Sequence, residues 1–421
     1  MTTPSSTPLA LALRQDVRSR RNRRRWVGCL AGSALLLLIA GVVGQRWKLD
    51  QLERACRLAK AEKRWSDLQT AAQGWTAWAP RSGAAWAFLA DAAQQQERFV
   101  EAAEYLSRVP NGVPEELPSL LARCKILMGP ANQQYLGEQA CLELLKREPR
   151  VTEVHELLIQ FYAVTLQRDK LRERIVEAIR LRRETPDVYI YHFFIDSLRL
   201  AQGPTLCELW LKTHPDDEHL AVAQALHRAD AALHDPNSKG DADPTILTEM
   251  ERDAVELLRQ FPNNTNLLAF LIDEEITKGR LPEVLRLLGQ STDNAERDPR
   301  FWRYQGWVHF VRGEITEAEA AYRKALAMHP MDWLTLHRLA ELLRTRGASD
   351  EIVRLENLVA RANELRVKIR NLPSAKNPPP ETLREIGQLA RDTGDTLVAE
   401  ALDRRVGLKK VAPPPKATLP R

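Results

Sequence analysis

The sequence is poor in the residues and motifs that build enzymes or disulfide-stapled domains. Only five of its 421 residues are cysteine, too few for a disulfide framework over this length. It contains no glycine-rich phosphate loop, no Gly-x-Ser-x-Gly nucleophile elbow and no His-Glu-x-x-His metal motif. These absences predict a chain with no catalytic activity, cofactor or metal site of its own. Whether Cys124 and Cys141, expected on the two helices of one hairpin, form a disulfide is left open.

Two weak metal-like patterns are interpreted as ordinary surface. His227, Asp230 and His234 share one predicted helix face, but a fourth ligand is missing. The loop that follows resembles a calcium loop, yet Lys239 and Ile246 stand where oxygen ligands are needed. We therefore predict an exposed, Asp- and Gly-rich turn.

Beyond the N-terminal residues, positive and negative charges nearly balance. The chain carries +5 in all, and its first 26 residues, with seven arginines and one acid, account for +6. The remaining residues sum to −1, so nucleic-acid binding by this part has no electrostatic support. Long alternating segments are also lacking, and Ala, Leu, Arg and Glu dominate, which predicts helices rather than strands.

One long apolar run is present. The stretch Val27–Gly44 has 18 residues without a charge, or about 27 Å as a helix, and Trp26 and Trp47 flank it. It predicts a single transmembrane helix over residues 27–47. The arginine-rich arm before it favours a cytoplasmic N-terminus and an extracytoplasmic remainder, and would contact anionic lipid. A cleaved signal peptide is the alternative.

Prolines recur at a nearly constant interval after apolar helical stretches. Pro80, Pro114 and Pro149 lie 34 and 35 residues apart, and Pro262 and Pro330 lie 68 apart. Because proline cannot continue a helix, this spacing indicates boundaries between helical hairpins of about 34 residues. An insertion is expected in the loop around residues 234–244, where the interval is too long.

The stretch Pro299–Pro330 shows the repeat most clearly. Its characteristic residues, at positions 4, 8, 15, 20, 24, 27 and 32, are Trp302, Gly306, Gly313, Ala318, Tyr322, Ala325 and Pro330. This pattern resembles the tetratricopeptide repeat (TPR), a helix–turn–helix unit that buries its apolar face only against neighbouring copies. The resemblance implies an all-α fold, a right-handed α-solenoid of TPR-like repeats.

The resulting domain organisation has six parts. They are a disordered basic arm (1–26), the transmembrane helix (27–47), a TPR solenoid (48–372), a Pro-rich linker (373–380), a terminal TPR-like hairpin (381–409) and a disordered tail (410–421).

The resemblance also implies where a partner would bind. In TPR units, positions 2, 5, 9 and 12 of the first helix line a concave groove. The candidate groove residues in two successive units are Arg300, Arg303, Trp307, Phe310, His337 and Glu341. Arginine beside large aromatic residues is typical of a binding hot spot.

We predict a membrane-anchored TPR scaffold that mediates protein–protein interactions, with protein or peptide partners of unknown identity. The alternative is an assembly or biogenesis accessory of an envelope enzyme complex, of the polymer-synthesis or cytochrome-maturation type, which rests on analogy.

Overall fold

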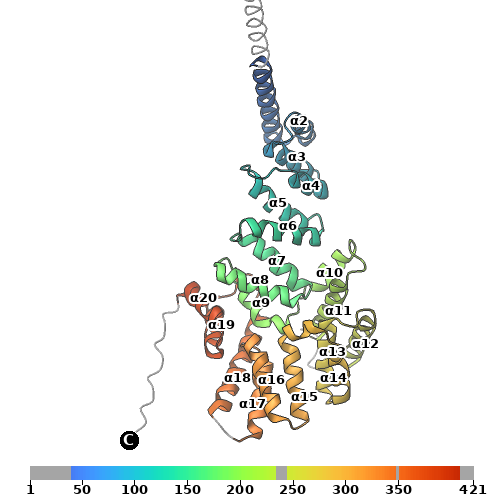
Figure 1. Cartoon of the computed structure of the whole chain (residues 1–421), viewed down its shortest axis with the longest axis vertical. Helices are drawn as coiled ribbons and strands as arrows, with labels where there is room; N and C mark the ends of the chain where they lie inside the picture. The colour runs from blue at the N-terminus through green and yellow to red at the C-terminus, as the bar shows by residue number, and fades with distance from the viewer. Residues whose placement is uncertain (1–38, 234–243, 348–349, 408–421) are drawn as a thin grey trace, which may run out of the picture. The chain divides into compact units, whose positions relative to one another are not determined.

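The computed structural model describes residues 39–233, 244–347 and 350–407. All regular elements in these three ranges are helices, and none is a strand, which confirms the all-α prediction. The chain divides into two compact units, residues 1–123 and 124–421, and each is described by itself. In both, helices that are consecutive in sequence pack pairwise, as the TPR resemblance implies (Figure 1).

The first unit is built from one helix whose described part covers residues 39–61, followed by short helices. These are α2 (Trp65–Trp78), α3 (Gly83–Gln95), α4 (Phe99–Ser107) and the start of α5 (Glu116–Met128). Its core consists of apolar side chains from the first helix, α2 and α3, among them Cys56, Leu68, Trp75 and Leu89. Small side chains in this core, such as that of Ala72, let neighbouring helices lie close together, and aromatic side chains such as that of Trp75 fill the space beside them.

The second unit contains the remaining helices. They are α6 (Gln134–Arg147), α7 (Thr152–Val164), α8 (Arg168–Leu181), α9 (Val188–Phe194), η1 (Ile195–Ser197), α10 (Gly203–Leu211), α11 (Glu218–Leu233), α12 (Pro244–Gln260), α13 (Thr265–Thr277), α14 (Leu281–Leu288), η2 (Asp293–Arg297), α15 (Pro299–Val311), α16 (Ile315–Met328), α17 (Trp333–Thr345), α18 (Asp350–Arg370), α19 (Pro380–Thr393) and α20 (Thr396–Val406).

The hairpin α15–α16 shows what the repeat residues do. A Cβ atom added to Gly306 would lie 2.6 Å from the ring of Tyr322, so only glycine lets the two helices cross this closely. Ala318 and Tyr322 are fully buried at the same crossing. Trp302, at position 4, donates from Nε1 to the carbonyl of Glu296 over 2.9 Å. The indole at position 4 thus ties the first helix to the segment before it.

The turns and starts of the hairpins recur with the period of the repeat. Gly279, Gly313 and Gly347 occupy equivalent places in successive repeats and have φ of 69°, 78° and 101° at the turns after α13, α15 and α17. Asn264, Asp298 and Asp332 are equivalent in the same way, and each accepts a hydrogen bond from a backbone N–H of the first helical turn. Side-chain capping of this kind satisfies donors that a helix N-terminus leaves open. The first helix of each of these repeats therefore begins at a capping side chain and ends at a glycine turn, and both recur at the interval of one repeat.

The C-terminal hairpin α19–α20 returns to the middle of the second unit. Helix α20 packs on α8 and α19 packs on α9, as the red and green helices of Figure 1 show. His192 Nε2 lies 2.7 Å from Asp395 Oδ2, although 203 residues separate them in sequence. Arg405 also donates to the carbonyl of Glu184 over 2.6 Å. The helices from α8 to α20 consequently form a closed circuit of contacts.

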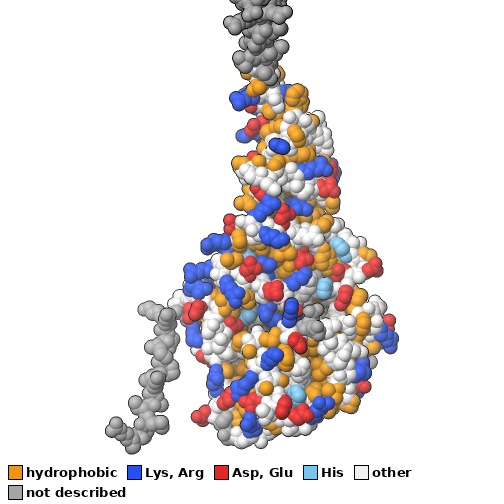
Figure 2. Space-filling view, viewed as in Figure 1, with side chains coloured by type: hydrophobic (Ala, Val, Ile, Leu, Met, Phe, Trp, Pro, Cys, Tyr) orange, Lys and Arg blue, Asp and Glu red, His pale blue; other side chains and the backbone are white. Residues whose placement is uncertain are grey.

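The predicted N-terminal arm, most of the apolar stretch Val27–Gly44, the Asp-rich loop and the C-terminal tail lie outside the described residues. Residues 39–44 of the apolar stretch are helical and exposed. Within the described ranges, no helix combines the length and the hydropathy that crossing a bilayer requires. On the face shown in Figure 2, Lys and Arg side chains alternate with Asp and Glu, which is typical of a solvated surface.

Candidate partner-binding face

The predicted groove residues lie on the adjoining surfaces of α13, α15 and α17, here called the first-helix face. Arg300 and Arg303 are 4 % and 6 % exposed, and both have internal partners. Arg300 donates from Nε to Asp298 Oδ1 over 3.0 Å, and Arg303 donates from Nη1 to Asp332 Oδ2 over 2.8 Å. The two guanidinium groups therefore form the wall of the face, held by the aspartates that cap α15 and α17.

Arg300, Arg303 and Asp298 keep their charged forms although they are buried, because each lies next to a group of opposite charge. Burial alone lowers the pKa of Arg300 and of Arg303, but Asp298 and Asp332 outweigh it and raise both pKa values above the ordinary one. Burial likewise raises the pKa of Asp298, and Arg300 more than reverses this, so that its pKa lies below its usual range. The wall consists of ion pairs with fixed geometry.

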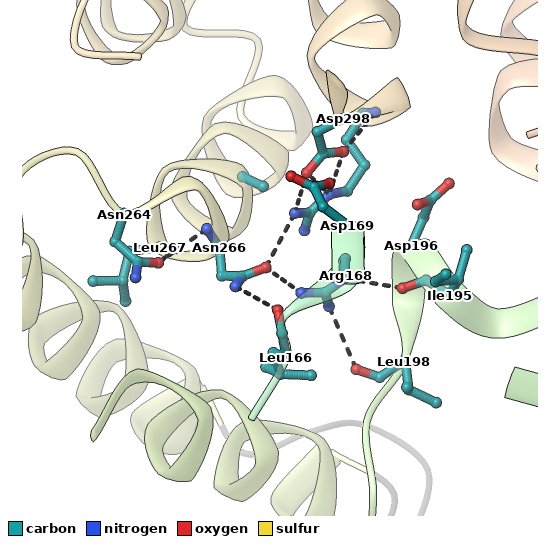
Figure 3. Close-up of polar contacts among 12 residues, drawn as sticks. Leu166, Arg168, Asp169, Ile195, Asp196, Leu198, Asn264, Asn266, Leu267 and Asp298 are labelled. Carbon is teal, nitrogen blue, oxygen red and sulfur yellow. Dashed lines mark hydrogen bonds and ion pairs between the residues drawn. The ribbon is translucent and has the colours of Figure 1, made fainter. Parts of the chain in front are cut away.

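One end of the first-helix face is covered by the chain's own residues, from α8 to the segment after η1. Arg168 donates from Nε to the carbonyl of Ile195 over 2.9 Å and also bonds to the side-chain oxygen of Asn266 (Figure 3). Asn266 in turn donates to the carbonyl of Leu166 over 2.9 Å. Burial lowers the pKa of Arg168, and the nearby charge of Arg300 adds to this effect. A buried cation thus joins three distant segments through carbonyl and amide oxygens.

Asp196 of η1 extends the same cover. Its carboxylate accepts a hydrogen bond from Arg172 Nη2 over 3.0 Å and lies 2.6 Å from His329 Nδ1. Arg172 comes from α8 and His329 follows α16, so the carboxylate joins three elements. The segment α8–η1 therefore occupies part of the surface on which a ligand of the repeats would lie.

Two cavities of about 220 and 170 Å³ lie along the face and share Asp273, Arg303 and Leu334 as lining residues. The larger one borders the cover, because Asp196 and His329 also line it. Trp307, 7 % exposed, lines the smaller one, as do Ile276 and other residues of α13 and α17. These cavities present a mixed apolar and charged floor along α13, α15 and α17. A peptide backbone or a helix fits such a surface better than a small molecule does.

The predicted residues divide accordingly. Arg300 and Arg303 line the larger cavity, and Arg303 and Trp307 line the smaller. Phe310, His337 and Glu341 are half-buried and line neither cavity.

Sequence reasoning missed several lining residues, among them Ile276 and Arg338 in the smaller cavity and Phe193 and Asp196 in the larger. Ile276 occupies the repeat position of Phe310, one unit earlier, so the register alone could have identified it. Arg338 stands between the groove positions of the repeat, and its place depends on how α17 packs.

Three side chains considered for disulfide or metal chemistry, Cys124, Cys141 and His227, are buried. Cys124 and Cys141 are fully buried free thiols. The hydrogen bond between Cys141 and Cys124 and, to a smaller extent, burial raise the pKa of Cys141 far above its ordinary value, which disfavours the reactive thiolate. His227 bonds to the carbonyl of Val164 over 2.8 Å. Among the described side chains, no cluster of three or more potential metal ligands occurs.

Known proteins to which this chain is similar include repeat proteins. No family model matches the chain. It is 23 % identical over 183 residues, 41 % of this chain, to a TPR repeat-containing protein of Pseudomonas aeruginosa, of which the match covers 28 %. Solved structures similar to it include a tetratricopeptide repeat protein from Parabacteroides merdae, with 12 % identity, a TM-score of 0.26, and coverage of 70 % of this chain and 99 % of that one. Yeast Tom70 has 12 % identity, a TM-score of 0.28, and coverage of 86 % and 77 %.

Proposed function

We propose that this chain is a non-catalytic TPR scaffold that binds a protein partner along the first-helix face. The observation that carries the proposal is the pair of adjoining cavities across α13, α15 and α17, at the positions where the repeat register places a groove. Their lining combines an aromatic anchor, Trp307, with the aliphatic side chains of Ile276 and Leu334. Such a surface suits an extended peptide or an amphipathic helix with one large apolar side chain.

The charges around the cavities give the partner an orientation. Asp273 and Arg303 stand on the wall, with 3.6 Å between the carboxylate and the guanidinium group. Arg338 pairs with Glu341 over 2.9 Å on the next helix. Because both signs are present, polar partner groups are positioned here, whereas the affinity comes from apolar burial around Trp307.

The test uses two variants of the full chain. Trp307→Ala removes the anchor and is expected to lower capture of the specific partner at least about tenfold, because a buried aromatic hot spot contributes about 2 kcal/mol or more. Trp78→Ala, which truncates a half-exposed tryptophan of the first unit, is the matched control and should leave capture unchanged. The measurement is quantitative affinity purification with circular dichroism of each variant. Equal capture by a folded Trp307→Ala chain would refute the assignment of the face.

We also propose that residues 27–47 anchor the scaffold in a membrane, with the N-terminus in the cytoplasm and the repeats on the other side. The support is the uncharged stretch, the flanking tryptophans and the arginine-rich arm. An anchor would hold the repeats near the bilayer and raise the effective concentration of partners there.

A membrane-impermeant reagent provides the check on topology. A tag after residue 421 should react in intact cells, and a tag before residue 1 should react only after the cells are opened. The reverse pattern would contradict the orientation, and release of the chain into the soluble fraction would contradict the anchor.

A further inference from the structure

Two buried histidine–aspartate contacts lie where the helix circuit of the second unit closes. His192 of α9 is 2.7 Å from Asp395, which caps α20, and His329 is 2.6 Å from Asp196 of η1. The histidines are 6 % and 2 % exposed, and their rings stand 5.8 Å apart at 68°. The two contacts therefore form one cluster, which joins α9, η1, the end of α16 and the C-terminal hairpin.

Each imidazole in the cluster has only one hydrogen-bond partner. His192 Nδ1 and His329 Nε2 are buried and unpaired. The contact with the aspartate must therefore offset the cost of burying the rest of the ring. A hydrogen bond between an imidazolium and a carboxylate is roughly twice as strong as one between neutral groups. Loss of the proton weakens the contact and leaves a buried carboxylate less well compensated.

The charged groups around the cluster come from every element that packs on it. His329 faces Asp196 of η1, Asp332 at the start of α17 and Arg172 of α8, and it contacts His192 of α9. His192 faces Asp395. Arg300 of α15 also acts on Asp196, and Arg303 of α15 pairs with Asp332, so both carboxylates are shared with guanidinium groups.

The balance of these charges sets the direction in which pH acts. Burial alone lowers the pKa of His329, but Asp196 and Asp332 outweigh it and raise this pKa. A raised pKa means that the contact stabilises the fold fully below about pH 6.5 and loses this contribution as pH rises through the folded-state value. Burial raises the pKa of Asp196, and His329 and Arg172 reverse this to a value well below its usual range. The aspartate therefore stays charged except in strong acid.

We propose that the two contacts form a clasp that the proton on His329 operates. With His329 protonated, η1 is held on the first-helix face, and the ring contact with His192 holds the hairpin α19–α20 on α9. When this proton leaves, η1 and the hairpin loosen together, and the end of the face covered by Asp196 becomes accessible. The clasp is a property of the second unit and does not depend on the identity of a partner.

The test is hydrogen–deuterium exchange of the full chain at about pH 6 and about pH 8.5, with labelling times scaled to the intrinsic exchange rate. Protection of α9–η1 and α19–α20 is expected to fall several-fold at the higher pH relative to the rest of the unit, because the contribution of protonated His329 is lost there. Peptides from α15–α16 serve as the internal reference. Unchanged protection in both segments would overturn the proposal.

Variants separate titration from packing. His329→Gln keeps an N–H donor but cannot gain a proton, so protection should be low at both pH values. His309→Gln alters a surface histidine, 2.5 Å from Glu314, and should keep the full pH response. Should His329→Gln fail to fold, Asp196→Asn decides, because asparagine keeps an oxygen acceptor at this place but carries no charge. We expect protection of α9–η1 to be low already at about pH 6, and a wild-type response in this variant would overturn the clasp.

Discussion

At the turn between the two helices of several hairpins, one residue adopts a left-handed backbone conformation. Glycine fills this place in the turns after α13, α15 and α17, but Lys63 and Glu97 fill it in the first unit, with φ of 56° and 60°. A side chain there costs about 1 kcal/mol relative to glycine, because Cβ approaches the following carbonyl oxygen. The repeat period thus persists in the backbone where the glycine signature is lost.

Replacing Glu97 with glycine should therefore stabilise the first unit, by up to about 1 kcal/mol. Urea unfolding followed by tryptophan fluorescence measures the change. Gly313→Ala, the opposite exchange at the equivalent turn, is the control and should destabilise the second unit by a similar amount. A less stable Glu97→Gly chain would contradict the repeat geometry assigned to this turn.

The crossing of α15 and α16 yields a second prediction at the scale of one residue. Gly306→Ala places a Cβ atom 2.6 Å from the ring of Tyr322, and the overlap should cost about 1–3 kcal/mol. In the background Tyr322→Leu, where the ring is absent, the same change should cost much less. The measurement is a double-mutant cycle on urea unfolding, and additive effects would show that the two residues do not meet at the crossing.

At the scale of the elements, Arg168 joins α8, η1 and α13. Arg168→Ala leaves the carbonyl of Ile195 and the side-chain oxygen of Asn266 without this donor. We expect a loss of about 3 kcal/mol, since buried acceptors that lose a charged donor retain their desolvation cost. Exchange protection of α9–η1 should fall before that of α15–α16. Arg180→Ala, an exposed arginine on the same helix, should have little effect.

Helices whose packing depends on residues close together in the sequence could be predicted from the sequence. Trp302, Gly306 and Tyr322 meet within one hairpin, so their spacing alone indicated the α15–α16 unit. The environment of Arg300 could not be predicted in the same way. Its position in the repeat suggested an open groove, but segments from a distant part of the sequence cover that end of the face, and the spacing of a repeat contains no information on such contacts.

At the scale of the whole second unit, the closed circuit of helices could likewise not be predicted from the sequence pattern. The terminal hairpin was expected from its repeat-like residues, but its return to α8–α9 depends on contacts such as that between His192 and Asp395, 203 residues apart. The capping residues Asn264, Asp298 and Asp332, in contrast, recur in the sequence at the interval of one repeat. Periodic local features are therefore predictable here, whereas the closure is a property of the folded unit.

The central claim is that a protein partner lies on the first-helix face, and site-specific photo-crosslinking tests it most directly. A photoreactive amino acid at Leu334, inside both cavities, should crosslink one discrete partner, and the same group at Val353, exposed on α18, should not. Adding Trp307→Ala to the Leu334 probe should reduce the crosslink about tenfold or more, as it reduces capture. Equal crosslinking from both positions, or a product at Leu334 that the loss of Trp307 leaves undiminished, would contradict the account.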